Sequence, residues 1–148
     1  MSKWDFLYDI QKSFDFDLEI KEDTAVLINK ITKAKIEIYK EIYYMDDQRK
    51  NVFYEYIVIF TTQHRHFDDL NKVNGYVCKI LTDDVLPIEF YKDGKNKFGG
   101  ELSKAEFEKL SKRFLADRFG YTEEYISLFE YEIHSWSGKY DTVRQNEE

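Results

Sequence analysis

Residues 51–60, NVFYEYIVIF, constrain the fold of this chain more than any other segment. Apart from Asn51 and Glu55, every residue of the stretch is apolar or aromatic, in both phases of a two-residue alternation. This pattern is typical of a strand inside a sheet, because such a strand is covered on both faces. We therefore predict that residues 51–60 form the central strand of a sheet.

Alternating segments predict further strands beside this one. Residues 14–20 alternate apolar residues with Asp15, Asp17 and Glu19, which indicates a strand with an acidic outer face. Asp93-Gly94 is a strong signal for a two-residue hairpin turn. The other expected strands lie in a continuous apolar run at 24–31, a second alternation at 35–44 and the hairpin at 85–98, with a polar turn at 45–51.

Apolar residues at spacings of three and four predict four helices. Asp68 or Asp69 is expected to cap the helix that follows the central strand. Ser103 and Glu106 have the S-x-x-E spacing of a capping box at the start of the next helix. The four predicted helices cover residues 3–14, 68–81, 103–120 and 122–137.

These elements predict an α+β fold: a mostly antiparallel sheet of four to six strands, with an N-terminal helix, one middle helix and two C-terminal helices. A chain of 148 residues suggests one domain, which we place at 1–140, followed by a frayed polar tail at 141–148. The sequence has neither a signal-peptide pattern at its start nor an apolar window of about 18 residues. We therefore expect a soluble, cytoplasmic protein that does not enter a membrane.

The net charge of −7 is concentrated near the two ends of the sequence. Residues 1–24 hold seven acids and three bases and residues 121–148 hold seven acids and two bases, so the ends carry −9 and the rest carries +2. The negative net charge argues against direct binding of nucleic acid, which requires a positive surface. The acidic ends suit a basic protein partner, or they keep the protein soluble.

The segment HRHFDDL at 64–70 is the only candidate for metal chemistry. On a strand, His64 and His66 point to the same side and would present two imidazoles, with Asp68 close by. The segment resembles the H-x-H-x-D-H motif of the metallo-β-lactamase family, but Asp69 replaces the last histidine. The alternative, which we favour, is a junction in which residues 61–65 are a polar connector and the aspartates cap the next helix.

No other motif points to catalysis or to a cofactor. Cys78 is the only cysteine, and no histidine lies at a spacing that would activate it, so we predict a buried structural thiol. No phosphate-binding glycine loop and no nucleophile elbow occurs. We expect no catalytic residue, no cofactor and no resident metal.

Tyrosines and carboxylates are interleaved near both ends of the chain. The helical spacings predict that Tyr8 and Tyr131 lie on polar faces, whereas Tyr125 faces the core. Exposed tyrosine beside carboxylate suits a protein-binding surface, because the ring supplies buried area and the charge steers the partner. The alternative is an aromatic-rich composition without a binding role.

In size, charge and tyrosine–acid composition, the chain resembles the small acidic immunity proteins of bacterial toxin–immunity pairs, including contact-dependent inhibition systems. The resemblance implies a protein that is not an enzyme and that binds and neutralises a cognate basic toxin domain, often a nuclease. Its carboxylates would then take the place of the phosphates of nucleic acid. On this basis the partner-binding residues are expected to be Asp15, Asp17, Glu19, Tyr8, Glu123, Glu124, Tyr131 and Glu132.

Two alternatives remain open at this stage. A phage-encoded inhibitor of a host nuclease would use the same acidic surface. A metal-dependent hydrolase would instead be centred on His64, His66 and Asp68.

Overall fold

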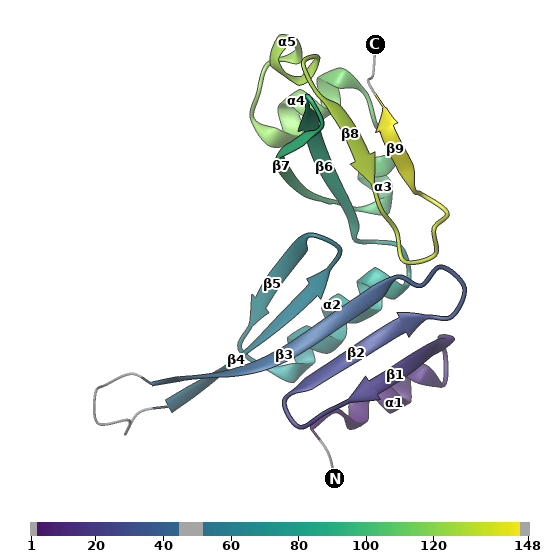
Figure 1. The fold of residues 1–148 in the computed structure, drawn as a ribbon, viewed down its shortest axis with the longest axis vertical. Coiled ribbons are helices and arrows are strands. Elements are labelled where there is room, and N and C mark those ends of the chain that lie inside the picture. Colours follow the sequence, from purple (N-terminus) through teal and green to yellow (C-terminus); the bar gives the residue numbers. More distant parts are fainter. Residues whose placement is uncertain (1–2, 45–51, 146–148) are drawn as a thin grey trace. The chain divides into compact units, whose positions relative to one another are not determined.

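The computed structural model describes residues 3–44 and 52–145. It confirms the α+β class, with antiparallel pairing between all neighbouring strands of its two sheets. The chain divides into two compact units, Met1–Leu81 and Thr82–Glu148, where we expected one domain at 1–140 built on a single sheet. Each unit has its own sheet and its own helices (Figure 1).

Unit 1 is a five-stranded sheet with the strand order β1-β2-β3-β4-β5 and two helices. Consecutive strands are neighbours throughout, so the sheet is a simple meander. The elements are α1 (Asp5–Gln11), β1 (Phe16–Ile20), β2 (Thr24–Asn29), β3 (Lys35–Tyr44), β4 (Val52–Phe60), β5 (Gln63–Phe67) and α2 (Leu70–Leu81).

Two predictions for unit 1 need correction. The strand predicted at 51–60 exists as β4, but it lies second from the edge, and β3 is central. The expected polar connector at 61–65 is wrong, because Phe60 pairs with Gln63 across a tight turn and β5 follows as an edge strand. This strand supplies partners for the backbone groups that β4 would otherwise leave unpaired. The turn predicted at 45–51 lies outside the described residues.

The core of unit 1 lies on one side of this sheet. Alternate strand residues, among them Leu27, Ile38 and Val58, are fully buried there. Trp4 at the N-cap of α1, Leu7 within α1 and the apolar stripe of α2 are buried with them. Asp69 confirms its predicted role at the start of α2, because its Oδ1 accepts a hydrogen bond from the backbone N–H of Lys72 at 2.9 Å.

Unit 2 is a four-stranded sheet with the order β7-β6-β8-β9, accompanied by three short helices. Its core is largely aromatic and aliphatic, with Phe90, Leu115 and Ile133 fully buried. The elements are β6 (Leu86–Lys92), β7 (Lys95–Leu102), α3 (Lys104–Phe107), α4 (Lys112–Phe119), α5 (Glu123–Ile126), β8 (Glu130–Ile133) and β9 (Thr142–Gln145).

The hairpin and the first helix cap of unit 2 are confirmed. Asp93 and Gly94 have φ angles of 55° and 77°, as a two-residue hairpin turn with both central residues at positive φ requires. Ser103 and Glu106 form the predicted capping box. The single helix expected at 103–120 is nevertheless two helices, since Ser111 is a second N-cap and its Oγ accepts from the N–H of Phe114 at 3.0 Å.

The C-terminal part of unit 2 also differs from the prediction. The helix expected at 122–137 begins with Thr122 as its cap, but it ends after Ile126, and β8 follows. Within the frayed tail predicted at 141–148, residues 142–145 instead form β9 against β8, and residues 146–148 lie outside the described residues. Both changes have one cause: β8 gains backbone partners on both of its edges, from β6 and from β9.

None of the described helices is long and apolar enough to cross a membrane.

Candidate functional site

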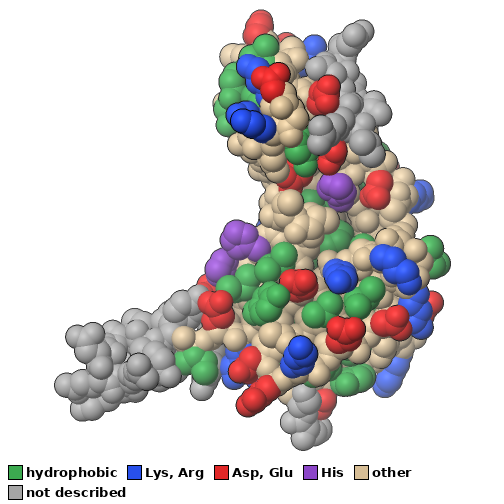
Figure 2. Space-filling model, in the orientation of Figure 1, with side chains coloured by type: hydrophobic (Ala, Val, Ile, Leu, Met, Phe, Trp, Pro, Cys, Tyr) green, Lys and Arg blue, Asp and Glu red, His purple; other side chains and the backbone are tan. Residues whose placement is uncertain are grey.

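The side of the unit 1 sheet that faces away from its buried core is the candidate site, and we call it the outer face. Its side chains alternate along each strand with the buried ones. No described element of unit 1 covers it, and Figure 2 shows hydrophobic side chains over these strands with both acidic and basic side chains among and around them. The outer face comprises the apolar residues Val26, Ile28, Ile57 and Ile59, the acids Asp17, Glu19, Glu37, Glu41 and Glu55, and Thr24, Lys35, Tyr39, His64 and His66.

Strand register places these residues in rows across the sheet. One row runs from Glu19 through Val26, Glu37 and Ile59 to His64. Neighbouring strands are about 4.8 Å apart, so this row is about 19 Å long. Apolar and acidic side chains therefore alternate along it, and an approaching surface would meet both kinds at once.

The apolar residues of the outer face are half-buried rather than fully exposed. Val26, Ile28, Ile57 and Ile59 all have intermediate exposure. Val26 and Ile28 come from β2 and Ile57 and Ile59 from β4, whereas the strand between them, β3, presents Lys35, Glu37 and Tyr39 on this face. The outer face thus has two apolar pairs, which we together call the apolar centre, on either side of the polar residues of β3, with further carboxylates on β1 and at the far parts of β3 and β4.

Hydrogen bonds fix several polar groups of this face. The Tyr39 hydroxyl donates to Glu37 Oε2 at 2.8 Å, and this hydrogen bond raises the pKa of the tyrosine. His66 Nδ1 lies 2.8 Å from Glu55 Oε1. The polar side chains next to the apolar centre are therefore held in place before any partner binds, which lowers the entropic cost of binding.

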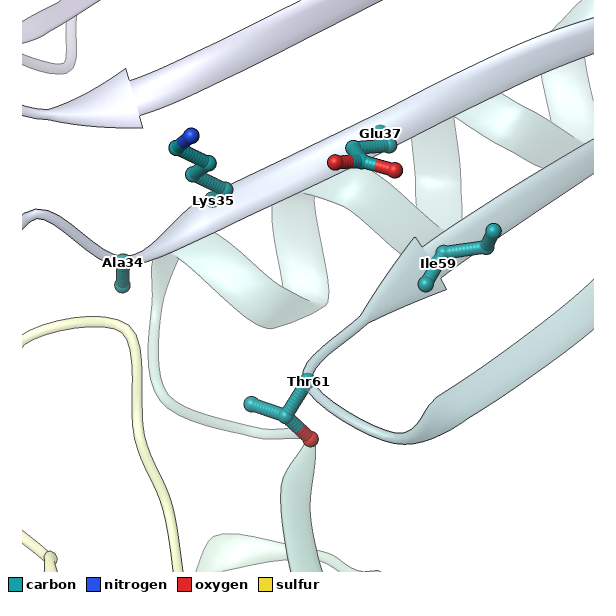
Figure 3. Close-up of a pocket in the computed structure, with 5 residues that line it drawn as sticks. All are labelled: Ala34, Lys35, Glu37, Ile59 and Thr61. Carbon is teal, nitrogen blue, oxygen red and sulfur yellow. The ribbon is translucent and has the colours of Figure 1, made fainter.

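A small hollow lies at one corner of the outer face. It has a volume of about 220 Å³ and is lined by Ala34, Lys35, Glu37, Ile59 and Thr61. Figure 3 shows that these residues come from the start of β3, the end of β4 and the turns beside them. The volume is below the roughly 300 Å³ at which small-molecule sites begin, so the hollow suits one side chain of a partner.

The predicted acids of unit 1 divide into two kinds. Asp17 and Glu19 are exposed on the outer face, and neither forms an ion pair with another described residue. Asp15 is paired with Lys30 at 2.9 Å, and this hydrogen bond raises the pKa of the lysine. Tyr8 is exposed on α1, so it lies away from the outer face.

The predicted residues of unit 2 form a separate group. Glu123 and Glu124 are exposed in the first turn of α5, whereas Glu132 is half-buried, 3.6 Å from His134 Nε2. The predicted place of Tyr131 on a polar face is wrong, since the ring is 3% exposed. Residue 131 belongs to β8, where alternation and not helical spacing decides its side.

The histidine segment brings two of its three candidate ligands together. The rings of His64 and His66 lie side by side, with centroids 5.3 Å apart. Asp68 pairs instead with Lys72 at 2.7 Å, and this hydrogen bond lowers the pKa of the aspartate. The described part of the chain contains no group of three histidine, cysteine or acidic residues that could hold a metal ion.

Cys78 is half-buried on α2. Its Sγ lies 3.8 Å from Asn74 Oδ1, and burial raises the pKa of the thiol. A raised pKa leaves less thiolate at neutral pH, which is the opposite of what a nucleophile needs.

No family model matches the chain, and neither a curated protein nor a solved structure is significantly similar to it. The apolar centre of the outer face was missed as a binding surface from the sequence. Its signal was present in residues 51–60, which are apolar in both phases and therefore predict a cover on each side of the strand.

Proposed function

We propose that the chain is a binding protein without catalytic activity, an immunity-type inhibitor that neutralises a basic protein through the outer face of unit 1. The observation that carries the proposal is the half-buried apolar centre, Val26, Ile28, Ile57 and Ile59, which no described element of its own unit covers. Apolar surface bordered by polar residues marks interaction sites in soluble proteins, and here an apolar pair lies on each side of Glu37.

The composition of the outer face supports a protein as the occupant. Protein interfaces combine an apolar centre that excludes water with a polar border. The face has both, and its hollow accepts about one side chain. A small molecule would need a larger cavity than this one.

The charge of the face supports a basic partner. Asp17, Glu19 and Glu37 lie on it together with Glu41 and Glu55, against Lys35 near its border. Such a surface attracts a positively charged protein and speeds the encounter, and it repels nucleic acid. A toxin nuclease is basic where it binds its substrate, so an acidic face of this kind would compete for that groove. The proposal places the pair in the cytoplasm.

The test uses the protein encoded by the adjacent reading frame as the partner and measures association by stopped flow. The double variant Asp17→Lys/Glu19→Lys should slow association about tenfold, because it reverses two exposed charges on the face. Raising the salt concentration should slow the wild type steeply and the variant less.

The matched control is the double variant Glu108→Lys/Asp117→Lys, which reverses two exposed carboxylates of unit 2 and so changes the net charge by the same amount. Its association rate should change by less than about twofold at physiological salt, where the Debye length is about 8 Å. Equal slowing by the control and by Asp17→Lys/Glu19→Lys would show that only net charge matters. A wild-type association rate that does not change with salt concentration would contradict the proposal.

A further inference from the structure

A second hollow lies in unit 2, and the residues that line it differ in type from those of the outer face. It has a volume of about 410 Å³ and is lined by aromatic rings and two lysines. We call it the aromatic hollow. Its lining residues are Lys92, Lys97, Phe98, Tyr121, Tyr125 and Phe129.

The rings of the aromatic hollow form one connected cluster. Tyr121 and Tyr125 lie 4.7 Å apart between centroids, and Phe98 lies 5.0 Å from Tyr121. Phe129 is buried and contacts both Phe98 and Tyr125. Tyr121 and Tyr125 are nevertheless 41% and 40% exposed. The two tyrosine rings are therefore partly exposed to solvent while being held in place by the rings packed against them.

The polar groups at this hollow have no partners within the described residues. Neither Lys92 nor Lys97 forms an ion pair there, and both are exposed. The hydroxyls of Tyr121 and Tyr125 have no hydrogen-bond partner among these residues either. Two ammonium groups and two hydroxyls are thus available at the edge of an aromatic surface.

We propose that the aromatic hollow binds a nucleoside monophosphate, with its base against the tyrosine rings and its phosphate on Lys92 and Lys97. Nucleobases stack on aromatic side chains, and lysine binds phosphate as a point charge. The volume falls within the range of about 300–1,000 Å³ found for small-molecule sites. The two lysines disfavour a cationic ligand, which an aromatic cluster would otherwise accept.

A free nucleotide fits better than a nucleic-acid strand. Glu123 and Glu124 are exposed on α5, the helix that also carries Tyr125. They would repel the further phosphates of a strand. The site is independent of the proposed function, because that function rests on unit 1.

The experiment titrates the full-length protein with adenosine monophosphate by calorimetry. Adenosine, inorganic phosphate and a 12-residue oligoadenylate serve as comparison ligands. The monophosphate should bind at least about fivefold more tightly than adenosine or phosphate, because only it engages both rings and lysines. Absence of binding at millimolar monophosphate, or an equal affinity for adenosine or for phosphate, would overturn the proposal. So would tighter binding of the oligoadenylate.

Variants locate the site. Lys92→Gln/Lys97→Gln and Tyr125→Ala should each weaken binding of the monophosphate at least about fivefold, through loss of phosphate contacts and of stacking respectively. Tyr125→Phe keeps the ring and should retain most of the affinity. Lys109→Gln removes an exposed lysine of the same unit that does not line the hollow. The affinity of this variant for the monophosphate should therefore equal that of the wild type. Equal weakening by Lys109→Gln, or none by the other variants, would refute this location.

Discussion

Strands β4 and β6 are interior strands of their sheets, yet they differ in how far they are buried. In β6 every residue from Leu86 to Phe90 is buried, including Pro87 and Glu89. In β4, Val58 and Phe60 are buried, whereas Ile57 and Ile59 are only half-buried. β6 is thus buried on both of its sides, whereas β4 is buried on one side and half-buried on the other. An apolar side without a cover in its own unit is where a partner would bind.

The second side of β6 carries a buried acid. Glu89 is 2% exposed, and the side-chain amide of Asn96 donates a hydrogen bond to its Oε2. A carboxylate in such a place requires partners within the fold. On β4 the corresponding acid, Glu55, is only half-buried, and its partner is the exposed His66.

The largest expected effect on stability comes from a substitution in β6, the interior strand of unit 2. Phe90→Ala should lower the free energy of unfolding of unit 2 by about 3–5 kcal/mol. The ring is fully buried and lies 4.4 Å from Phe98 and 5.3 Å from Phe119 between centroids. Urea unfolding followed by Trp136 fluorescence, in a Trp4→Phe background, measures this unit alone, since each unit contains one tryptophan. An unchanged midpoint would contradict the assigned core.

The two sides of the unit 1 sheet can be compared with one chemical change. Ile38→Ala, at a fully buried position, should cost about 2–5 kcal/mol of unfolding free energy. Ile57→Ala, on the outer face, should cost about 1 kcal/mol, because less surface returns to water. Trp4 fluorescence in a Trp136→Phe background measures both. Equal costs would show that the outer face is as buried as the core.

Packing in unit 2 leaves no room at one glycine. A Cβ on Gly100 would lie 2.7 Å from Cε1 of Phe119, so Gly100→Ala should destabilise unit 2 by about 1–3 kcal/mol. Gly75→Ala in α2 is the matched control: nothing lies within 4 Å of its Cβ position. This control should stabilise unit 1 by about 0.5–1 kcal/mol, because alanine suits a helix better. Thermal unfolding of the two variants should therefore shift in opposite directions.

The smallest expected effect is on the pH dependence of the stability of unit 2. Partial burial opposes ionisation of Glu106, but hydrogen bonds from the Ser103 N–H and from Arg118 outweigh it and hold the pKa of Glu106 below its usual value. A lowered pKa in the folded state stabilises the fold above the unfolded pKa, about 4.3, and this stability is lost as the pH falls through the folded pKa. Glu106→Gln should flatten that part of the stability–pH curve. An unchanged slope would contradict the account.

Sequence patterns predicted correctly those elements for which the local sequence signals and the tertiary structure favour the same conformation. The alternation at 35–44 gave β3, Asp93-Gly94 gave the hairpin turn, and Ser103 gave a helix cap. The helix expected at 122–137 failed, because tertiary pairing of residues 130–133 with β6 overrides a spacing that also suits a helix.

The candidate site was predicted only in part. Acidic alternation placed Asp17 and Glu19 on an outer face, and the structure agrees. Tyr131 was misplaced with the failed helix, and Asp15 is paired with Lys30. The acids near the two ends of the chain were predicted as one set of partner-binding residues, yet Asp17 and Glu124 belong to different units.

Binding of the basic protein from the adjacent reading frame by the double variant Ile57→Ala/Ile59→Ala tests the outer face most directly. These residues form the part of the apolar centre that β4 supplies, so their loss should raise the dissociation constant at least tenfold, about 1.4 kcal/mol or more. Unit 1 should remain folded, as Trp4 fluorescence would show. A folded double variant that binds this partner as tightly as the wild type would contradict the claim that a protein covers the outer face.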